Sequence, residues 1–428
     1  MTSRPQECFV YLQLPGTLEV VTCGRYALLL RSDGTALGQF VYGRNYRSDP
    51  RAVELDKFEL PLKSGTFETT RMRGIFGALR DASPDAWGRR VIERQLGRAD
   101  LTELEFLLNS PDDRAGALSF GLSQSPPAPA GSFNRVLQLP QLLAAAEHIL
   151  DGNATTEGAA AVQQELADVI HPGTSMGGAR PKSVVEDEDG LWLAKFPMRD
   201  DRWNNAPVEA AMLELARACG IRTPRAKVVH VAGTQVLLVR RFDREKLSGG
   251  YLRHRMVSAL TVLGSDDDPL ARGDWSYPRL ADEVKRWVKD PESDLKELFR
   301  RIVFNALISN LDDHPRNHAL VAPGGDWMLS EAYDLTPSPV VAADKRDLAL
   351  EVGTYNRYAN RENILSSCAR FRLRRDEANA IIDDMKLTVE RRWREALLSA
   401  GAAPADCETV ARAFAYPGFE HDPRDVLA

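Results

Sequence analysis

Cysteine and long apolar runs are both scarce in this chain. Its five cysteines are scattered and never form a CxxC pair, which fits reduced thiols and argues against a disulfide framework or a zinc site. No apolar run approaches the roughly 18 residues that span a bilayer, and Met1 to Glu7 contain no apolar stretch of the signal-peptide type. We therefore expect a cytoplasmic protein without a membrane partner.

A strong net charge is also absent. The 428 residues carry 55 basic and 61 acidic side chains, for a net charge of −6, so the whole chain is not expected to attract nucleic acid. Arginine is nevertheless concentrated in 370–375 and 391–394, which we expect to be helical. The favoured interpretation of these runs is a solvated helix face, and the alternative is a phosphate or partner contact.

The N-terminal residues have strand patterns. Residues 8–14 are apolar and partly alternating. Residues 26–30 and 35–42 flank Ser32-Asp33-Gly34, a turn whose glycine suits the left-handed conformation of a hairpin.

Helical patterns follow these strands. Residues 75–108 predict helix, and Ser83-Pro84-Asp85 is a plausible helix start. The proline-rich stretch 123–132 favours a linker, so we place a domain boundary near it. Residues 137–152 and 157–170 again predict helix.

The next part of the chain predicts two more hairpins. Residues 183–186 and 191–196 flank the turn Asp187-Glu-Asp-Gly190, and 226–232 and 235–239 flank Gly233-Thr234. Strand patterns therefore dominate this part of the chain.

A helix is expected between the two hairpins. It spans about 207–219, with Gly220 suited to the C′ position. Beyond residue 255 helical patterns dominate. A strand-rich half followed by a helical half suggests two lobes with a cleft between them.

The densest group of polar residues lies in this helical half. Asp312 and Asn317 are five apart, and Asp334 follows a strand, Pro-Gly-Gly turn and strand at 319–329. Protein kinases arrange a catalytic base and two metal ligands in this way. The preceding helix has apolar residues on one face, with Ser293 as a plausible N-cap.

Phosphoryl transfer needs positioning and charge neutralisation more than covalent chemistry. We expect Asp312 to be the base, in preference to Asp313, because only Asp312 has the five-residue step to Asn317. Asn317 and Asp334 would hold Mg²⁺ through oxygen ligands. An Asp-x4-Asn pattern alone is common by chance, and a capped turn is its alternative interpretation.

Two further segments fit the same chemistry. The Gly-rich stretch 173–182 would let backbone N–H groups approach phosphate oxygens, although a flexible turn is equally compatible. Lys195 lies in an otherwise apolar strand, where a lysine is costly unless paired. Glu209 is its expected helix partner, Glu214 the alternative, and a snorkelling edge-strand lysine the interpretation without function.

The crossing between the two lobes is expected at 238–244. Backbone groups of Arg240, Arg241 and Phe242 could pair with an adenine edge. Asp243 and Arg244 are expected to form a local ion pair.

Taken together, these motifs resemble those of HipA-family serine/threonine kinases, the toxin halves of bacterial toxin–antitoxin pairs. The resemblance covers nearly the whole chain. It rests on 80–90 and 113–120 in the first module, and on 175–182, 194–197, 241–244, 311–317 and 333–337 in the second.

This resemblance implies an α+β, two-lobed protein-kinase-like fold with an N-terminal α/β subdomain and an all-α C-terminal lobe. The domains would span 1–125, 133–242 and 243–428. The cofactors would be ATP and Mg²⁺, and Ser175 would be an autophosphorylation site whose added charge ejects the Gly-rich loop. The expected ATP-binding residues are Gly177, Gly178, Ala179, Arg180, Lys182, Lys195, Arg240, Arg241, Phe242 and Asp334.

The resemblance also implies partners. They are a small HipB-like helix-turn-helix antitoxin, operator DNA reached through the antitoxin complex, and a protein substrate such as an aminoacyl-tRNA synthetase. A catalytically weak kinase fold that only binds an antitoxin as corepressor is the alternative function. A metal-dependent hydrolase built on Asp312, Asp313 and His314 leaves Lys195 and the Gly-rich stretch unexplained.

Overall fold

The computed structural model divides into two compact units. It describes residues 6–128, 133–151, 178, 180–338, 342–414 and 416–427. The first unit comprises Met1–Met198, Arg240–Val257 and Val321–Asp326, and the second comprises Arg199–Val239, Ser258–Leu320 and Trp327–Ala428. The chain therefore passes more than once between the units, and the expected module 133–242 contributes to both. The three expected domain boundaries stay predictions.

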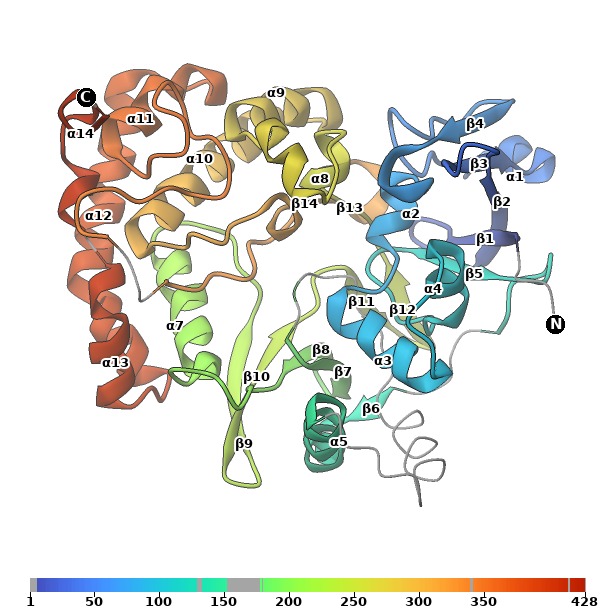
Figure 1. Cartoon of the computed structure of the whole chain (residues 1–428), viewed down its shortest axis with the longest axis horizontal. Helices are drawn as coiled ribbons and strands as arrows, with labels where there is room; N and C mark the ends of the chain where they lie inside the picture. The colour runs from blue at the N-terminus through green and yellow to red at the C-terminus, as the bar shows by residue number, and fades with distance from the viewer. Residues whose placement is uncertain are drawn as a thin grey trace. The chain divides into compact units, whose positions relative to one another are not determined.

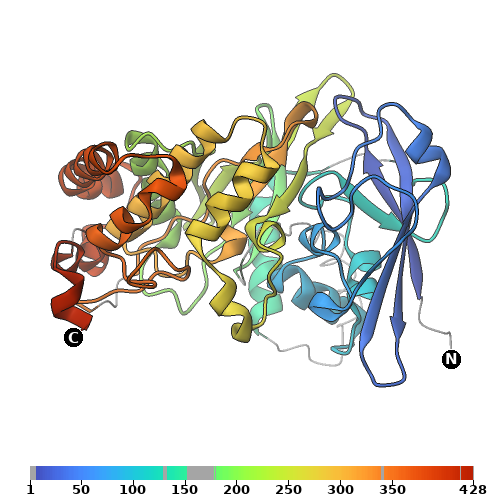
Figure 2. The same cartoon turned by 90° about the horizontal axis from the view of Figure 1, so that it is seen from above.

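An antiparallel sheet begins the first unit (Figure 1). Its strand order is β4-β3-β2-β1-β5. The strands are β1 (Glu7–Gln13), β2 (Val20–Leu30), β3 (Ala36–Tyr42), β4 (Thr66–Thr69) and β5 (Leu118–Gly121). Leu30 pairs with Ala36 across the predicted turn, and Gly34 has a φ of +84°, which confirms the hairpin. Figure 2 shows these N-terminal strands side by side.

The helices of the first unit lie between and after these strands along the chain. They are α1 (Arg44–Ser48), α2 (Gly77–Asp81), α3 (Ala86–Leu96), α4 (Glu103–Asn109) and α5 (Leu139–Asp151). Asp85 caps α3 by accepting a hydrogen bond from the Gly88 N–H, so the predicted start at 83–85 is confirmed. The helix expected at 157–170 lies outside the described residues.

The first unit also contains a second group of strands. They are β6 (Asn134–Arg135), β7 (Lys182–Asp187), β8 (Gly190–Lys195), β11 (Arg244–Leu247) and β12 (Gly250–Arg253). β7 and β8 form the predicted hairpin, with Lys182 directly opposite Lys195 in register. The β11–β12 hairpin was not predicted, because four of its eight strand residues are charged and the strands have no regular apolar alternation.

The second unit begins with a helix and a hairpin. These are α7 (Asn205–Ala218), β9 (Ala226–Val231) and β10 (Thr234–Arg240), whose last residue belongs to the first unit. Asn204 caps α7, and Gly220 takes the predicted left-handed conformation after it, with a φ of +76°.

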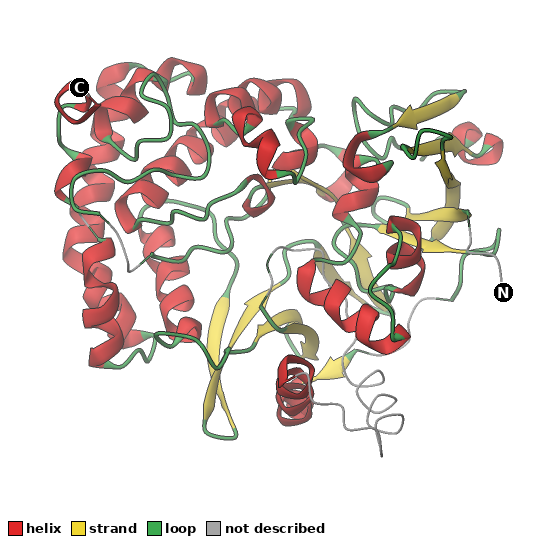
Figure 3. Ribbon diagram, in the orientation of Figure 1, coloured by secondary structure: helices red, strands yellow, loops and turns green. Residues whose placement is uncertain are grey.

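Helices make up most of the rest of the second unit, as the red ribbons of Figure 3 show. They are α8 (Ala259–Val262), α9 (Tyr277–Trp287), α10 (Pro291–Ile308), α11 (Arg361–Ser366), α12 (Arg375–Ser399), α13 (Pro404–Val410) and α14 (Pro423–Leu427). The short strands β14 (Ala319–Ala322) and β15 (Met328–Leu329) flank a turn at Pro323–Gly325, as predicted.

α10 is the central helix of the second unit. Every residue from Leu298 to Ile308 except Arg300 is buried, so the helix is covered on nearly all sides rather than on the one predicted face. The predicted N-cap Ser293 is wrong. The cap is Asp290, because Pro291 suits the first helical position and the Asp290 carboxylate accepts a hydrogen bond from the Glu292 N–H.

The structure describes the state of the cysteines and the length of the apolar helices. All five cysteines are buried free thiols. In the part of the chain that the structure describes, no helix is both long enough and apolar enough to cross a membrane.

Candidate functional site

The candidate catalytic loop leaves the C-terminal end of α10 through a strained residue. Ser309 has a φ of +54°, a left-handed conformation that residues other than glycine seldom adopt. Its hydroxyl donates a hydrogen bond to the Ala413 carbonyl at 2.6 Å. The Arg346 guanidinium donates in turn to the Ser309 hydroxyl. The packed helix and this anchor fix the direction in which 310–317 leaves α10.

Asp312 and Asn317 lie together at this loop. The Asn317 side-chain amide donates to the Asp312 backbone carbonyl at 3.2 Å, and the Asp312 side chain is exposed. Asn317 Oδ1 is buried and accepts no hydrogen bond from the residues that the structure describes. A buried amide oxygen without a donor is costly in an apolar setting, and it is an oxygen ligand of the kind that Mg²⁺ takes.

Asp313, in contrast, is part of the buried interior. It is 1% exposed, accepts a hydrogen bond from the Tyr277 hydroxyl, and lies 2.8 Å from the His318 Nε2. Burial and the neighbouring Asp313 carboxylate raise the pKa of Tyr277 well above its ordinary value, so the hydroxyl remains a donor. The structure thus exposes Asp312 and buries Asp313, and the assignment of Asp312 as the base stays a prediction.

A hydrogen-bonded chain joins this interior to the Asp334 segment. Asn305 donates to the Tyr277 hydroxyl at 3.4 Å and accepts from the Asn310 amide at 3.1 Å. Asn310 Nδ2 also lies 3.4 Å from the Asp334 carbonyl. Sequence reasoning did not find Asn305, Asn310 or Tyr277, since nothing in a single sequence marks which buried polar residues meet.

A second hydrogen bond ties the same two segments together. The Tyr333 hydroxyl donates to the Arg316 carbonyl at 2.7 Å, and Asp334 has a φ of +55°. The structure thus brings the Asp334 segment to the loop that carries Asp312 and Asn317. These three predicted residues belong to the second unit.

The donor set of this loop is small. Among the described residues, no group of three or more His, Cys, Asp or Glu side chains is placed to hold a metal ion. Asn317 and Asp334 supply one amide and one carboxylate, and Mg²⁺ is commonly held by one or two protein ligands together with substrate phosphates and water. The residues present therefore fit Mg²⁺ bound together with a nucleotide.

Glu209 and Lys195 belong to different units. Glu209 lies on α7 of the second unit and is 6% exposed. Lys195 ends β8 of the first unit and is partly buried. Their pairing stays a prediction.

The Gly-rich stretch is described only at its C-terminal end. Ser175, Gly177 and Ala179 lie outside the described residues. Gly178 is exposed and Arg180 is partly buried.

Lys182 is buried against the first α/β module. Its ammonium forms an ion pair with Asp85 at 2.6 Å, with side-chain exposures of 3% and 6%. Sequence reasoning had placed Asp85 at a helix start and within the motif at 80–90, without a partner for its carboxylate. The contact could not be predicted from local sequence patterns, because Asp85 and Lys182 are 97 positions apart. The role of Lys182 in ATP binding stays a prediction.

Three residues of the segment expected to cross between the lobes, Arg241, Asp243 and Arg244, take part in a buried charge cluster. The Arg241 backbone N–H donates to the Leu191 carbonyl at 3.0 Å, so this group is engaged within the protein. The Arg241 side chain pairs with Asp113 and Asp243. Arg244 pairs with Asp243 at 2.7 Å, which confirms the predicted local ion pair. Arg240 and Phe242 are partly buried, and their adenine contacts stay predictions.

Several arginines of the two runs pair with carboxylates. Arg370 pairs with Asp282 at 2.6 Å, and Arg375 pairs with Glu362 at 2.5 Å. Arg394 pairs with Glu408 at 2.6 Å. These contacts favour the solvated helix face over a phosphate contact.

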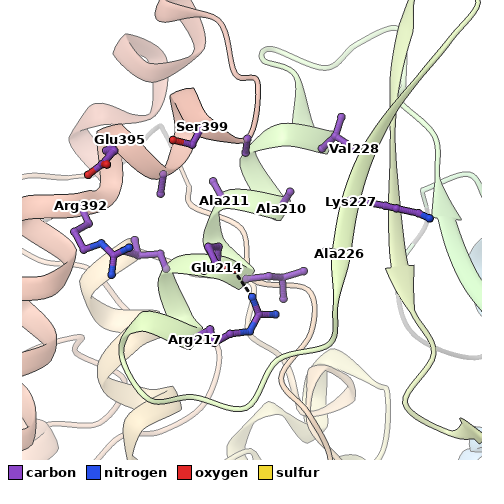
Figure 4. Close-up of a pocket in the computed structure, with 14 residues that line it drawn as sticks. Ala210, Ala211, Glu214, Arg217, Ala226, Lys227, Val228, Arg392, Glu395 and Ser399 are labelled. Carbon is purple, nitrogen blue, oxygen red and sulfur yellow. Dashed lines mark hydrogen bonds and ion pairs between the residues drawn. The ribbon is translucent and has the colours of Figure 1, made fainter. Parts of the chain in front are cut away.

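A cavity of about 400 Å³ lies between α7, α12 and β9. Small alanine side chains line much of it, and the Arg217–Glu214 ion pair lies at its edge (Figure 4). Apart from Glu214, the alternative partner of Lys195, none of the predicted site residues lines this cavity, and no residue of the candidate catalytic loop does.

Two family models match this chain. The HipA N-terminal domain matches residues 18–121, and the HipA-like C-terminal domain matches residues 174–393. The two matches include the motifs at Asp85, Lys182 and Asp312.

Individual relatives agree with these matches. The chain is 24% identical over 352 residues to "Putative kinase Y4mE" of Sinorhizobium fredii, covering 73% of this chain and 80% of that protein. A similarly named protein of Haemophilus influenzae is 25% identical over 193 residues, which cover 40% of this chain and 55% of that protein.

One solved structure shares the fold over nearly the whole length. It is the complex of HipA, HipB and operator DNA from Shewanella oneidensis MR-1. It matches with a TM-score of 0.66 and 15% identity, covering 95% of this chain and 94% of that chain. The predicted α+β fold is confirmed.

Proposed function

The chain belongs to the HipA family, and on that premise we propose that it is an ATP- and Mg²⁺-dependent serine/threonine-protein kinase that acts as the toxin of a toxin–antitoxin pair. One observation carries the proposal. Asp312, Asn317 and Asp334 lie on segments tied by direct hydrogen bonds, and the Asn317 Oδ1 is buried without a donor among the described residues. A base and two oxygen ligands in one place are what phosphoryl transfer needs.

Each residue has a defined part in the proposed reaction. Asp312 accepts the proton of a serine or threonine hydroxyl as that oxygen forms its bond to the γ-phosphorus, and the bond from this phosphorus to the ADP oxygen breaks. Its exposed side chain can reach a protein substrate. The buried Asp313, Tyr277 and His318 hold the loop rigid beneath it.

The remaining residues bind the nucleotide. Asn317 Oδ1 and the Asp334 carboxylate would hold Mg²⁺, which when bound neutralises charge on the transferred phosphate. Lys195, oriented by Glu209, would bind the α- and β-phosphates. Gly177, Gly178 and Ala179 would contribute backbone N–H groups, and Ser175 would be the autophosphorylation site.

Partners follow from the same premise. The relatives are named as kinases, and the HipA of the solved complex is bound to HipB and operator DNA. We infer a HipB-like helix-turn-helix antitoxin that brings this chain to operator DNA. A net charge of −6 favours contact with DNA through that partner. The toxic effect would come from phosphorylating a protein of translation, such as an aminoacyl-tRNA synthetase.

Transfer of labelled phosphate tests the proposal. The purified protein, incubated with γ-labelled ATP and Mg²⁺, should acquire label that maps to Ser175. Asp312→Asn should lower the initial rate by about 10²–10⁴-fold, the range for loss of a general base. Asp33→Asn, the same change at an exposed turn, should retain the full rate.

Two results would oppose the proposal. Full-rate transfer by Asp312→Asn would remove the assigned base. Failure of the wild type to bind ATP or transfer phosphate, while it still binds the antitoxin, would favour the corepressor function.

A further inference from the structure

Two lysines face each other across the β7–β8 hairpin. Lys182 and Lys195 are direct partners in register, and side chains at directly opposite positions lie on the same face of a sheet. Like charges placed in this way repel, and Lys182 is also 4% exposed. A buried ammonium beside a second one requires a nearby carboxylate.

Asp85 supplies that carboxylate from the first α/β module. Its Oδ2 lies 2.6 Å from the Lys182 Nζ, and its Oδ1 accepts the Gly88 N–H at 2.9 Å as the cap of α3. The Trp87 indole N–H donates to the Lys182 carbonyl at 3.1 Å. The start of α3 therefore holds both the side chain and the backbone of Lys182.

Lys182 also reaches back toward the Gly-rich stretch. Its Nζ donates to the Gly178 carbonyl at 3.2 Å, and Gly178 has a φ of +94°. A side chain at this position would be strained. One ammonium thus connects Asp85, the start of β7 and the end of the Gly-rich stretch.

We propose that Asp85 is a positioning residue for nucleotide binding. Acting through Lys182, it fixes the Gly178 carbonyl and the hairpin end that bears Lys195. This inference rests on the proposed kinase function. On this inference, Asp85 of the motif at 80–90 holds Lys182, which lies nearly 100 residues later in the chain, at the end of the proposed phosphate-binding stretch.

Asp85→Asn is the most informative change, because asparagine is also a good helix N-cap. The cap of α3 is kept, whereas Lys182 loses the carboxylate of Asp85. We expect the KM for ATP to rise about tenfold while kcat changes less than about twofold, the pattern for lost binding rather than lost chemistry.

The matched control is Glu103→Gln in the same module. It breaks the Arg89–Glu103 ion pair, whose two hydrogen bonds measure 2.9 and 2.6 Å, without touching Lys182. Both variants should lose stability, but only Asp85→Asn should change the KM for ATP. Equal changes in KM, or none in either variant, would overturn the inference.

A double-mutant cycle separates positioning from general stability. Once Lys182→Met has removed the connection, adding Asp85→Asn should leave the KM for ATP unchanged. The double variant also leaves no unpaired charge at the pair, which protects its folding. Additive effects of the two changes would contradict action through Lys182.

Equilibrium binding of a fluorescent ATP analogue distinguishes failure of the proposed kinase function from failure of the positioning role of Asp85. A wild type that binds no nucleotide refutes the kinase proposal itself. A wild type that binds, alongside an Asp85→Asn variant that binds equally well, refutes only the positioning role.

Discussion

Replacing Asp243 by asparagine should destabilise the first unit more than any comparable change of a surface charge. Asp243 is 0% exposed and accepts hydrogen bonds from the Arg241 guanidinium at 2.9 and 2.8 Å. It also accepts from Arg244 at 2.7 Å and from the Gly116 N–H at 2.9 Å. Asparagine preserves the shape of the side chain but removes its charge and places an N–H₂ group among donors.

The expected cost follows from the charges that remain. Asp113 and Asp243 balance Arg241 and Arg244 in the wild type, so Asp243→Asn leaves one buried positive charge uncompensated. Breaking a buried ion pair in this way costs about 3–5 kcal/mol. This is a large part of the roughly 5–15 kcal/mol by which domains are stable.

The full difference in stability between the wild type and Asp243→Asn should be present at neutral pH. Burial tends to raise the pKa of Asp243, but the Arg241 and Arg244 guanidiniums outweigh it and hold that pKa well below its ordinary value of 3.8. Because the pKa is lowered on folding, the stabilising contribution is present above pH 3.8 and is lost only as the pH falls further.

Urea unfolding at pH 7 measures the effect, through the midpoint at constant m. Asp112→Asn is the matched control, since the side chains of Asp112 and Arg253 in its ion pair are 23% and 10% exposed, and a pair nearer to solvent should contribute less than the fully buried one. A midpoint for Asp243→Asn no lower than that of Asp112→Asn would refute the reasoning.

Two further changes test buried groups elsewhere. Tyr277→Phe removes a donor from the buried Asp313 and should lower the free energy of unfolding by about 1–3 kcal/mol; an unchanged urea midpoint would contradict this. Asp56 accepts the Phe58 and Glu59 N–H groups, yet burial, then repulsion by neighbouring carboxylates, raises its pKa from 3.8 to about 7. The wild type should therefore lose stability as the pH rises through that window, and the Tm of Asp56→Asn relative to wild type should increase from about pH 5 to about pH 8. A constant Tm difference would exclude this titration.

Local patterns predicted most of the elements that position the site. The hairpin around Gly34, the β7–β8 hairpin and the end of α7 at Gly220 depend on turn and cap chemistry within a few residues. The prediction of Ser293 as the N-cap of α10 was wrong because Asp290, three residues earlier, is a good N-cap and is followed by Pro291 at the first helical position. Such errors of a few residues are what local reasoning produces when two caps compete.

Contacts between distant residues could not be predicted in this way. Asp85 meets Lys182 across 97 residues, and Gly116 meets Asp243 across 127. Each side chain alone has an ordinary local interpretation, as a helix cap or a neighbouring ion pair. Only the folded chain shows that these charges balance one another in the interior.

The buried charges suggest why the motifs of the first module accompany those of the catalytic loop in one chain. Residues 113–116 bind Arg241, Asp243 and Arg244, and Asp85 binds Lys182. Both contacts end on segments next to β8, where the Arg241 N–H holds the Leu191 carbonyl. Each of these pairs costs desolvation and would be replaceable by apolar residues if stability were its only purpose. Ion pairs with fixed donors and acceptors instead define one register for the strand that bears Lys195, which the proposed binding of ATP would require.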